Sequence, residues 1–402
     1  MTVRMTGSRR ALGDSHNFGR RVSLQRGRLV KPRALLWEWL LLSADSPLRR
    51  LLDQAARQDE LGDDAFGFLP TLRFYGGLDA RGGEVEQLRL DPLRSRSKAT
   101  RSALAGIVGR SLALWSWLGV ADLHWENLVL GTDRRGRVVF GPLDIEMILA
   151  ELSLPTETKL LPDADPEYAV ICQHAAGVRR VLPYLGKPIE VGDLLTMAAA
   201  YRATLELLDR HSAAIAKLFA SLPGLRETPL RVLLRGTAEY VNAGPATWPP
   251  LLEAEAEQLE RGDIPYFFRL YGRAGLHYFG NAALTELKRL PLRGDVPQLD
   301  PTLQVSRGLR SPTRQKLLAD GLLAVLAAFD HPGLRGKHAH PALAVSFAAR
   351  TLRVTFPDGE ELLSQRDLSA FVSSVYLPCR CGEVRTVFVP PVTVCKLGQQ
   401  GV

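Results

Sequence analysis

The sequence predicts an α+β protein with a small β-rich first part, a mostly helical middle part and a small β-rich tail. Early residues form short apolar runs between Gly and Asp turns, middle residues repeat apolar side chains at helical spacing, and late residues alternate with a period of two. The 402 residues exceed the length of one average domain. We therefore expect three units, which cover 1–95, 96–330 and 331–402.

Strands are expected first in the chain. Ser23–Pro32 predicts two short strands about a turn at Gly27, and residues 66–92 predict more strands around a Gly/Asp turn. Between them, Ala34–Leu52 has apolar residues at helical spacing and predicts a helix.

Helices are expected to dominate the middle of the chain. Ser97–Leu118 predicts a helix, residues 135–147 predict a pair of strands about a loop, and Val191–Val241 predicts mostly helix. Two further helices are expected at Leu251–Leu259 and Thr313–Phe329. Strands followed by helices is the order of a two-lobed kinase-like fold, with a small β-rich N-lobe and a mostly helical C-lobe.

The tail predicts short strands, with a turn at Pro357-Asp358-Gly359. Free thiols in a small β-rich appendage are the simplest interpretation of its cysteines, and a zinc site is the alternative. The residues available to such a site are His338, His340, Cys379, Cys381 and Cys395. Docking of a peptide along an edge strand of the tail is a further hypothesis, based on composition alone.

Composition excludes several classes of protein. No run of eighteen apolar residues occurs, so we expect no transmembrane segment, and four cysteines in a chain this long predict a cytoplasmic protein rather than a disulfide scaffold. Residues 1–35 hold nine Lys or Arg against one acid. This patch suits a polyanion or is a solvated basic face, and because no aromatic residues interleave it we expect no nucleic-acid partner.

The sharpest chemical signal is Asp122-Leu-His124-Trp-Glu-Asn127, followed by Asp144 at the end of a predicted strand. Phosphoryl transfer needs one carboxylate to accept the proton of the attacking hydroxyl, and an amide oxygen and a second carboxylate to hold magnesium. Asp122 and Asn127 have the five-residue spacing of a kinase catalytic loop. Capping of turns is the alternative role for the Asp and the Asn.

A kinase also needs a cation for the phosphates of the nucleotide. Lys31 lies in a predicted strand upstream of the catalytic loop, and Glu38 is a candidate ion-pair partner for it. Just before that strand, the turn Gly13–Gly19 is suited to covering phosphates with its backbone, with His16 as an added donor. A solvated strand lysine and a plain hairpin turn are the alternatives.

Four ordered motifs resemble one family. GDSHNFG with GRLVKPR resembles its GDxH…G…YKPR signature, and DLHWENLVLG…PLDIEM resembles its DxHxEN…DlE segment. RVLLRGTAEY resembles its RxxxRxTxxY helix, and GDIPYF resembles its motif of the same letters. The family is the dehydratase domain of class II lanthipeptide synthetases (LanM), and the motifs span residues 13–267 of this chain.

The resemblance implies a kinase-like fold and a two-step reaction on Ser and Thr of a precursor peptide. ATP phosphorylates the hydroxyl, and elimination of phosphate then leaves dehydroalanine or dehydrobutyrine. The residues implied for phosphoryl transfer are Asp14, His16, Lys31, Asp122, His124, Asn127 and Asp144, with ATP and Mg²⁺ as cofactors and Asn127 and Asp144 as metal ligands. Arg231 and Thr237 are implied for elimination, and Arg231 and Arg235 would share one helix face.

The chain also departs from the family. Its signature begins at residue 13, although the family has a substantial region before it, and Gly236 stands where the family usually has Pro. The zinc-dependent cyclase half is missing, so ring closure would need a separate cyclase or another biosynthetic enzyme. The expected partners are therefore the precursor peptide and such enzymes.

Three other functions stay open. The first is a kinase that leaves a stable phosphopeptide. The second is a small-molecule phosphotransferase of the aminoglycoside-kinase type, whose catalytic loop has a similar pattern. The third is a pseudokinase that binds a biosynthetic partner without turnover.

Overall fold

The protein is a mixed helix-and-strand protein, as the sequence predicts. The computed structural model describes residues 10–94, 97–150, 152, 155–161, 176–185, 191–243, 250–271, 273 and 275–290, together with six strands between 344 and 397.

A five-stranded antiparallel sheet opens the chain, with the strand order β1-β2-β3-β5-β4. Arg26 and Gly27 connect β2 to β3 with positive φ angles, as the type I′ turn of a tight hairpin requires. This hairpin was predicted, whereas the strand character of β1 was not. The strands are β1 (Arg10–His16), β2 (Arg20–Gln25), β3 (Arg28–Lys31), β4 (Phe74–Tyr75) and β5 (Gly83–Glu86).

The single helix predicted over Ala34–Leu52 is wrong, because the chain forms two helices there. These are α1 (Leu36–Leu42) and α2 (Pro47–Gln58). The Ser46 hydroxyl accepts the amide of Arg49 and caps α2, and Pro47 follows it at a position where its missing N–H costs nothing. Residues 66–92 are also more irregular than predicted, since only β4 and β5 form there.

The central helix α3 (Lys98–Leu118) matches its prediction closely. Ser97 caps its start by accepting the amide of Thr100, and Gly119 ends it at a φ of 64°. It packs against α6 (Val191–Arg210). The helices approach closely at Gly109, where a Cβ atom would lie 2.1 Å from the carbonyl oxygen of Met197.

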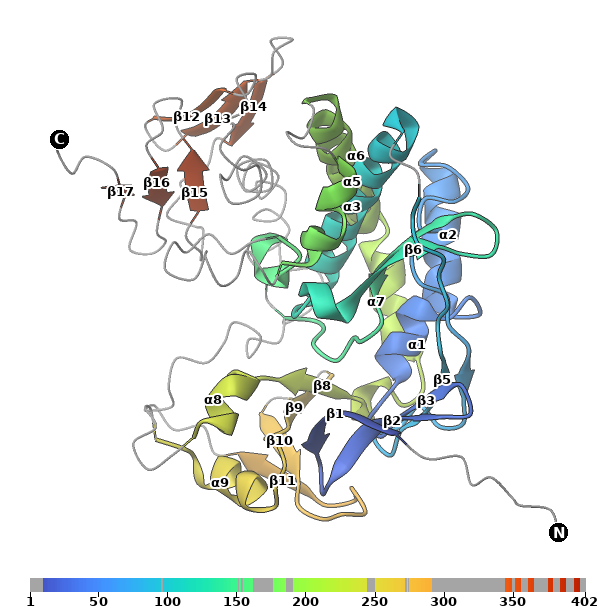
Figure 1. Ribbon diagram of the computed structural model, residues 1–402, viewed down its shortest axis with the longest axis vertical. Helices are drawn as coiled ribbons and strands as arrows, with labels where there is room; N and C mark the ends of the chain where they lie inside the picture. The colour runs from blue at the N-terminus through green and yellow to red at the C-terminus, as the bar shows by residue number, and fades with distance from the viewer. Residues whose placement is uncertain are drawn as a thin grey trace.

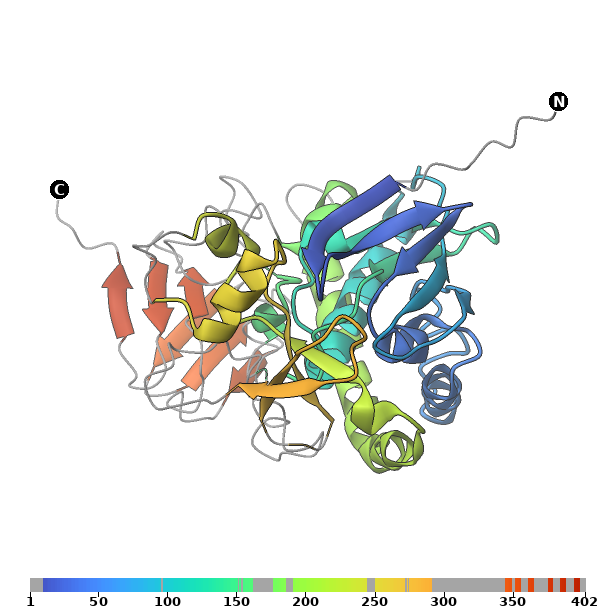
Figure 2. The same ribbon diagram turned by 90° about the horizontal axis from the view of Figure 1, so that it is seen from below.

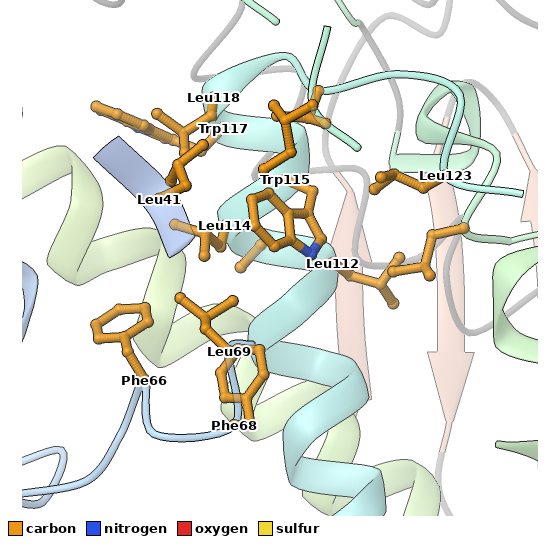
Figure 3. Close-up of a cluster of buried hydrophobic side chains, with 14 of the residues drawn as sticks. Leu41, Phe66, Phe68, Leu69, Leu112, Leu114, Trp115, Trp117, Leu118 and Leu123 are labelled. Atoms are coloured by element: carbon orange, nitrogen blue, oxygen red, sulfur yellow. The ribbon is translucent and has the colours of Figure 1, made fainter. Parts of the chain in front are cut away.

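The main hydrophobic core surrounds α3. Trp115 and Trp117 are fully buried among leucines and phenylalanines of α1, α3 and the loop before β4 (Figure 3). The indole N–H of Trp117 donates to Oδ1 of Asp209 over 2.7 Å, which joins α3 to α6. Each buried tryptophan removes about 150–250 Å² from water and contributes roughly 4–6 kcal/mol.

A four-stranded sheet was not predicted for the middle part, and its first strand interrupts the mostly helical stretch that forms over Val191–Val241 as expected. Its order is β11-β10-β9-β8. Short apolar runs such as these do not distinguish a strand from a buried helix by periodicity alone. The strands are β8 (Pro229–Val232), β9 (Phe267–Leu270), β10 (Leu276–Phe279) and β11 (Leu287–Leu290).

The two sheets lie side by side below the α3, α6 and α7 helices (Figure 1; Figure 2 views them from below). The hairpin of β6 (Leu128–Thr132) and β7 (Val138–Pro142) lies beside α3. Of the strand pair expected over residues 135–147, only β7 forms within that range, and its partner β6 lies earlier in the chain. The remaining α-helices are α5 (Leu182–Leu185), α7 (Ser212–Ser221), α8 (Thr237–Val241) and α9 (Glu253–Glu260). Short 3₁₀ helices form at Trp125–Asn127, Pro155–Thr158, Gly177–Arg180 and Leu225–Glu227.

The tail forms two three-stranded antiparallel sheets, which confirms its predicted β-rich character. Its strands are β12 (Ala344–Ala348), β13 (Thr351–Thr355), β14 (Glu361–Ser364), β15 (Val375–Pro378), β16 (Val384–Val387) and β17 (Val394–Leu397). The helix predicted at Thr313–Phe329 and the His338, His340, Cys379 and Cys381 of the zinc hypothesis lie outside the described residues. Within the described part of the chain, no helix is both long and apolar enough to cross a membrane.

Candidate active site

Lys31 and Arg33 point the same way from the end of β3. Pro32 between them disfavours a helical conformation at Lys31, and in an extended chain side chains two positions apart share one face. Both side chains are buried, with Lys31 only 4% exposed. Two buried cations need carboxylates close by, because an unpaired charge away from water is expensive.

Glu38 on α1 is the first of these carboxylates and is 0% exposed. The ammonium of Lys31 donates to both of its oxygens, at 3.0 and 2.8 Å, and to the carbonyl oxygen of Leu143 at 2.7 Å. The ion pair expected between Lys31 and Glu38 is therefore present. The hydrogen bond to Leu143 places the Lys31 ammonium next to the residue before Asp144.

Arg33 is a site residue that the sequence reasoning missed. Its guanidinium hydrogen-bonds Glu38 and Asp144, and its Nε lies 2.7 Å from Oε1 of Glu146. Asp144 and Glu146 are two positions apart in the irregular segment after β7, and both contact the Arg33 guanidinium. The sequence signal for this cluster was a pair of i, i+2 patterns, a basic one at Lys31 and Arg33 and an acidic one at Asp144 and Glu146.

Asp144 is the most exposed acid of this cluster, with 38% of its side chain accessible. Burial opposes its ionisation, but the charges of Arg33, Lys31 and Arg231 lower its pKa from 3.8 to about 2. Asp144 therefore stays ionised throughout the neutral range and presents a carboxylate to solvent.

The predicted catalytic loop lies beside the same cluster. Asp122 has a φ of 64°. The side-chain amide of Asn127 donates to the backbone oxygen of Asp122 at 2.9 Å and to its carboxylate at 3.3 Å. Nε2 of His124 lies 4.0 Å from Asp122, and Nζ of Lys159 lies 3.7 Å from it. The backbone oxygen of Asn127 accepts the amide of Leu143 at 3.1 Å, which places Asn127 next to the residue before Asp144.

Arg231 joins the cluster from a distant part of the chain. The helix predicted over Arg231–Tyr240 is wrong, because Arg231 lies in β8 and only Thr237 onward is helical. Nη1 of Arg231 lies 3.3 Å from Oε2 of Glu146, and its backbone N–H donates to the Glu146 carbonyl at 3.0 Å. Its guanidinium carbon is 5.3 Å from the centre of the Tyr266 ring.

The other three members of that motif do not reach the cluster. Arg235 is buried against Glu255, with a 2.9 Å hydrogen bond, and the Tyr240 hydroxyl donates to the same carboxylate at 2.8 Å. Thr237 is exposed, and within the described residues it makes no hydrogen bond to the cluster. The expectation that Arg231 and Arg235 share one helix face is therefore wrong.

His16 reaches the cluster from the end of β1. Its Nδ1 is 2.8 Å from the carbonyl oxygen of Ile264, which can only accept, so Nδ1 carries the proton and Nε2 keeps its lone pair. Burial and the charge of Arg231 lower the pKa of His16, so the ring is neutral near pH 7. Asp14 is exposed on the same strand, and its negative charge raises the pKa of His16, which opposes the effect of burial and Arg231.

Asp263 holds the turn that carries His16. Its carboxylate is 1% exposed and accepts the amides of Phe18 at 2.7 Å and Gly19 at 2.9 Å. The Ser15 hydroxyl donates to the same group at 2.7 Å. The GDSH and GDIPYF motifs therefore form one structural unit across the two sheets, a role that neither motif predicts alone.

A magnesium ion would find a sparse donor set. No group of three or more His, Cys, Asp or Glu side chains suited to a metal occurs in the described part of the chain. Mg²⁺ in phosphoryl-transfer sites needs only one or two protein oxygens beside phosphates and water. Asp144 is partly exposed and ionised, and Asn127 uses its amide nitrogen towards Asp122, which leaves its Oδ1 for a ligand. The predicted pair fits on these grounds.

Comparisons with known proteins assign nothing to this arrangement. No model of a known protein family matches the chain. No curated protein matches it either.

Proposed function

We propose that the protein phosphorylates Ser and Thr of a ribosomally made precursor peptide with Mg-ATP and then eliminates the phosphate. One observation supports both steps together. Arg231, from the segment that resembles the elimination motif, binds Glu146, two positions after the Asp144 of the kinase-type set. Phosphoryl transfer and elimination would therefore share one site.

The first step uses the kinase-type residues. Lys31, held by Glu38, would bind phosphate oxygens of the nucleotide, and Asp122 would orient the attacking hydroxyl and accept its proton. Asn127 and Asp144 would hold Mg²⁺, which supplies charge neutralisation on the phosphates. The hydroxyl oxygen bonds to the γ-phosphorus as the bond to ADP breaks.

The second step uses Arg231 and His16. A base removes the α-proton, the C–H electron pair becomes the Cα–Cβ double bond, and the Cβ–O bond breaks to release phosphate. Arg231 would hold the leaving phosphate through charge-assisted hydrogen bonds. His16 is neutral and has a free Nε2, so we assign it as the base.

The fold supports the kinase part of this proposal. A five-stranded antiparallel sheet carries Lys31, helix α1 after β3 carries Glu38, and the catalytic loop lies between helix α3 and strand β6. This is the order expected of a two-lobed kinase-like protein. The β8–β11 sheet is an addition to that order, and it delivers Arg231.

A kinase that leaves a phosphopeptide is the second candidate, and the position of Thr237 favours it. Thr237 is exposed instead of contacting the cluster. If elimination needs a hydroxyl at that place, the protein would stop after the first step.

Co-expression with the short peptide encoded beside its gene, followed by mass spectrometry, tests the proposal. Loss of one water per modified Ser or Thr supports both steps, and gain of phosphate supports the kinase alone. An unchanged peptide mass, with turnover of free small alcohols, would instead identify a small-molecule phosphotransferase. An unchanged mass without any ATP turnover would point to a pseudokinase.

A further inference from the structure

A cavity of about 890 Å³ lies against the five-stranded sheet. Its floor includes one residue from each strand, and these residues stand opposite one another in register across the whole sheet. They are Ala11, Ser23, Val30, Glu84 and Tyr75. The cavity is therefore a groove that crosses the strands.

This groove is separate from the catalytic cluster. Lys31 follows Val30 in β3, so their side chains point to opposite faces of the sheet. The Lys31 ammonium binds Glu38 and Leu143 on its own face, although the residue also borders the groove. Neither Asp122 nor Asp144 lines it.

The groove is strongly basic. Arg20, Arg21, Arg28 and Arg81 border it, and among its described lining residues Glu84 is the only acid. Arg28 bonds Glu84 at 2.9 Å. The Arg21 side chain makes no hydrogen bond or ion pair to any other residue that the structure describes. At least one guanidinium therefore has its full charge available to a ligand.

The dimensions and lining favour a peptide over a nucleotide. Four strand spacings of about 4.8 Å make a crossing of about 19 Å, which an extended chain spans with about six residues. A nucleobase would need an apolar or aromatic surface to stack on. Tyr75 is the only aromatic side chain among the described lining residues, and the Arg28 guanidinium already covers its ring at 3.9 Å.

We propose that this groove binds an acidic segment of the precursor peptide, outside the site where Ser and Thr react. The identity of the peptide as a substrate depends on the proposed function, whereas the binding itself does not. Docking of an acidic segment here would raise the effective concentration of the reactive part of the same chain at the cluster.

Binding is measured by fluorescence anisotropy with a labelled hexaglutamate peptide and, as a matched probe, hexaglutamine. No ATP or magnesium is present. We expect the acidic probe alone to bind, and more weakly as salt rises. Arg21→Glu with Arg28→Glu should weaken binding about tenfold, because exposed pairs are each worth a few-fold and reversal adds repulsion. Arg134→Glu with Arg135→Glu, on the exposed β6–β7 turn, is the control of equal charge.

Three further variants keep the test decisive. Arg21→Glu alone alters an exposed residue and should still weaken binding if the double variant misfolds, whereas Glu84→Gln should strengthen it. The proposal would be overturned if the groove variants and the control variants bound the acidic peptide equally well. It would also be overturned if the groove variants lost ATP binding but kept peptide binding. Asp122→Asn, at a residue that does not line the groove, should impair phosphorylation and keep peptide binding, which separates failure of the groove from failure of the proposed function.

Discussion

Ser15 donates a 2.7 Å hydrogen bond from its Oγ to Oδ1 of Asp263, which lies 248 positions later in the chain. The same carboxylate accepts the amides of Phe18 and Gly19. The turn next to His16 is thus held by a residue of the distant loop between α9 and β9.

Asp263→Asn should therefore lower the free energy of unfolding by about 1–3 kcal/mol, because one carboxylate oxygen becomes an N–H₂ that faces a buried donor. Chemical denaturation of both proteins measures this difference. Asp14→Asn, on the same hairpin but exposed, is the control and should change stability little. An unaltered midpoint for Asp263→Asn would contradict the clamp.

Arg33→Met should destabilise the protein by about 3–5 kcal/mol, because Glu38 and Glu146 lose a buried cation. Arg33→Lys should recover part of that loss. Arg81→Met removes an exposed pair with Asp79 and should cost about 1 kcal/mol or less. Similar effects of the Arg33 and Arg81 changes would show that the cluster does not need Arg33.

The Asp144 carboxylate should make stability pH-dependent in acid. Its folded-state pKa is about 2, against an ordinary value of 3.8. A depressed folded pKa contributes stability that is complete above the ordinary value and is lost as pH falls through the folded one. The stability difference between wild type and Asp144→Asn should shrink between about pH 4 and pH 2. A difference that stays constant over that window would refute the assigned shift.

Asp122→Asn should slow phosphoryl transfer by about 10²- to 10⁴-fold, since the amide cannot accept the hydroxyl proton. ATP binding should persist, because Lys31 and Asp144 are unchanged. Turnover and nucleotide affinity measured separately reveal this split. Asp45→Asn, an exposed change, is the matched control.

His16→Ala should leave the first step intact and cause phosphopeptide to accumulate, because no base remains for the α-proton. Arg231→Ala should do the same, with exposed Arg226→Ala as its control. Burial and Arg231 lower the pKa of His16 below 6.5, so elimination should decline only as pH falls through that lowered value. Loss of phosphorylation itself in His16→Ala would instead support a nucleotide-binding role for His16.

Local contacts could be predicted well because the chain supplies both partners within a few residues. Ser97 and Gly119 bound α3 as capping chemistry dictates, and the five-residue spacing of Asp122 and Asn127 produces their direct hydrogen bond. Boundaries were missed where a stop signal was overlooked, as at Pro47.

Distant contacts were predictable only in part. The pairing of Lys31 with Glu38 could be named because both lie near one strand end. Arg33 and Glu146 were not identified, since nothing local tells a cation which acid it will meet.

By itself, the sequence determined the β2–β3 hairpin, the helix α3, the β-rich tail and the set of charged residues proposed for phosphoryl transfer. The tertiary structure decided that Arg231 lies in a strand and meets Glu146, and that Asp263 holds the turn after His16. The physical reason is the distance along the chain over which each interaction acts. Capping, turns and periodicity act within a few residues, whereas burial of a charge selects its partner from whichever segments the folded core brings together.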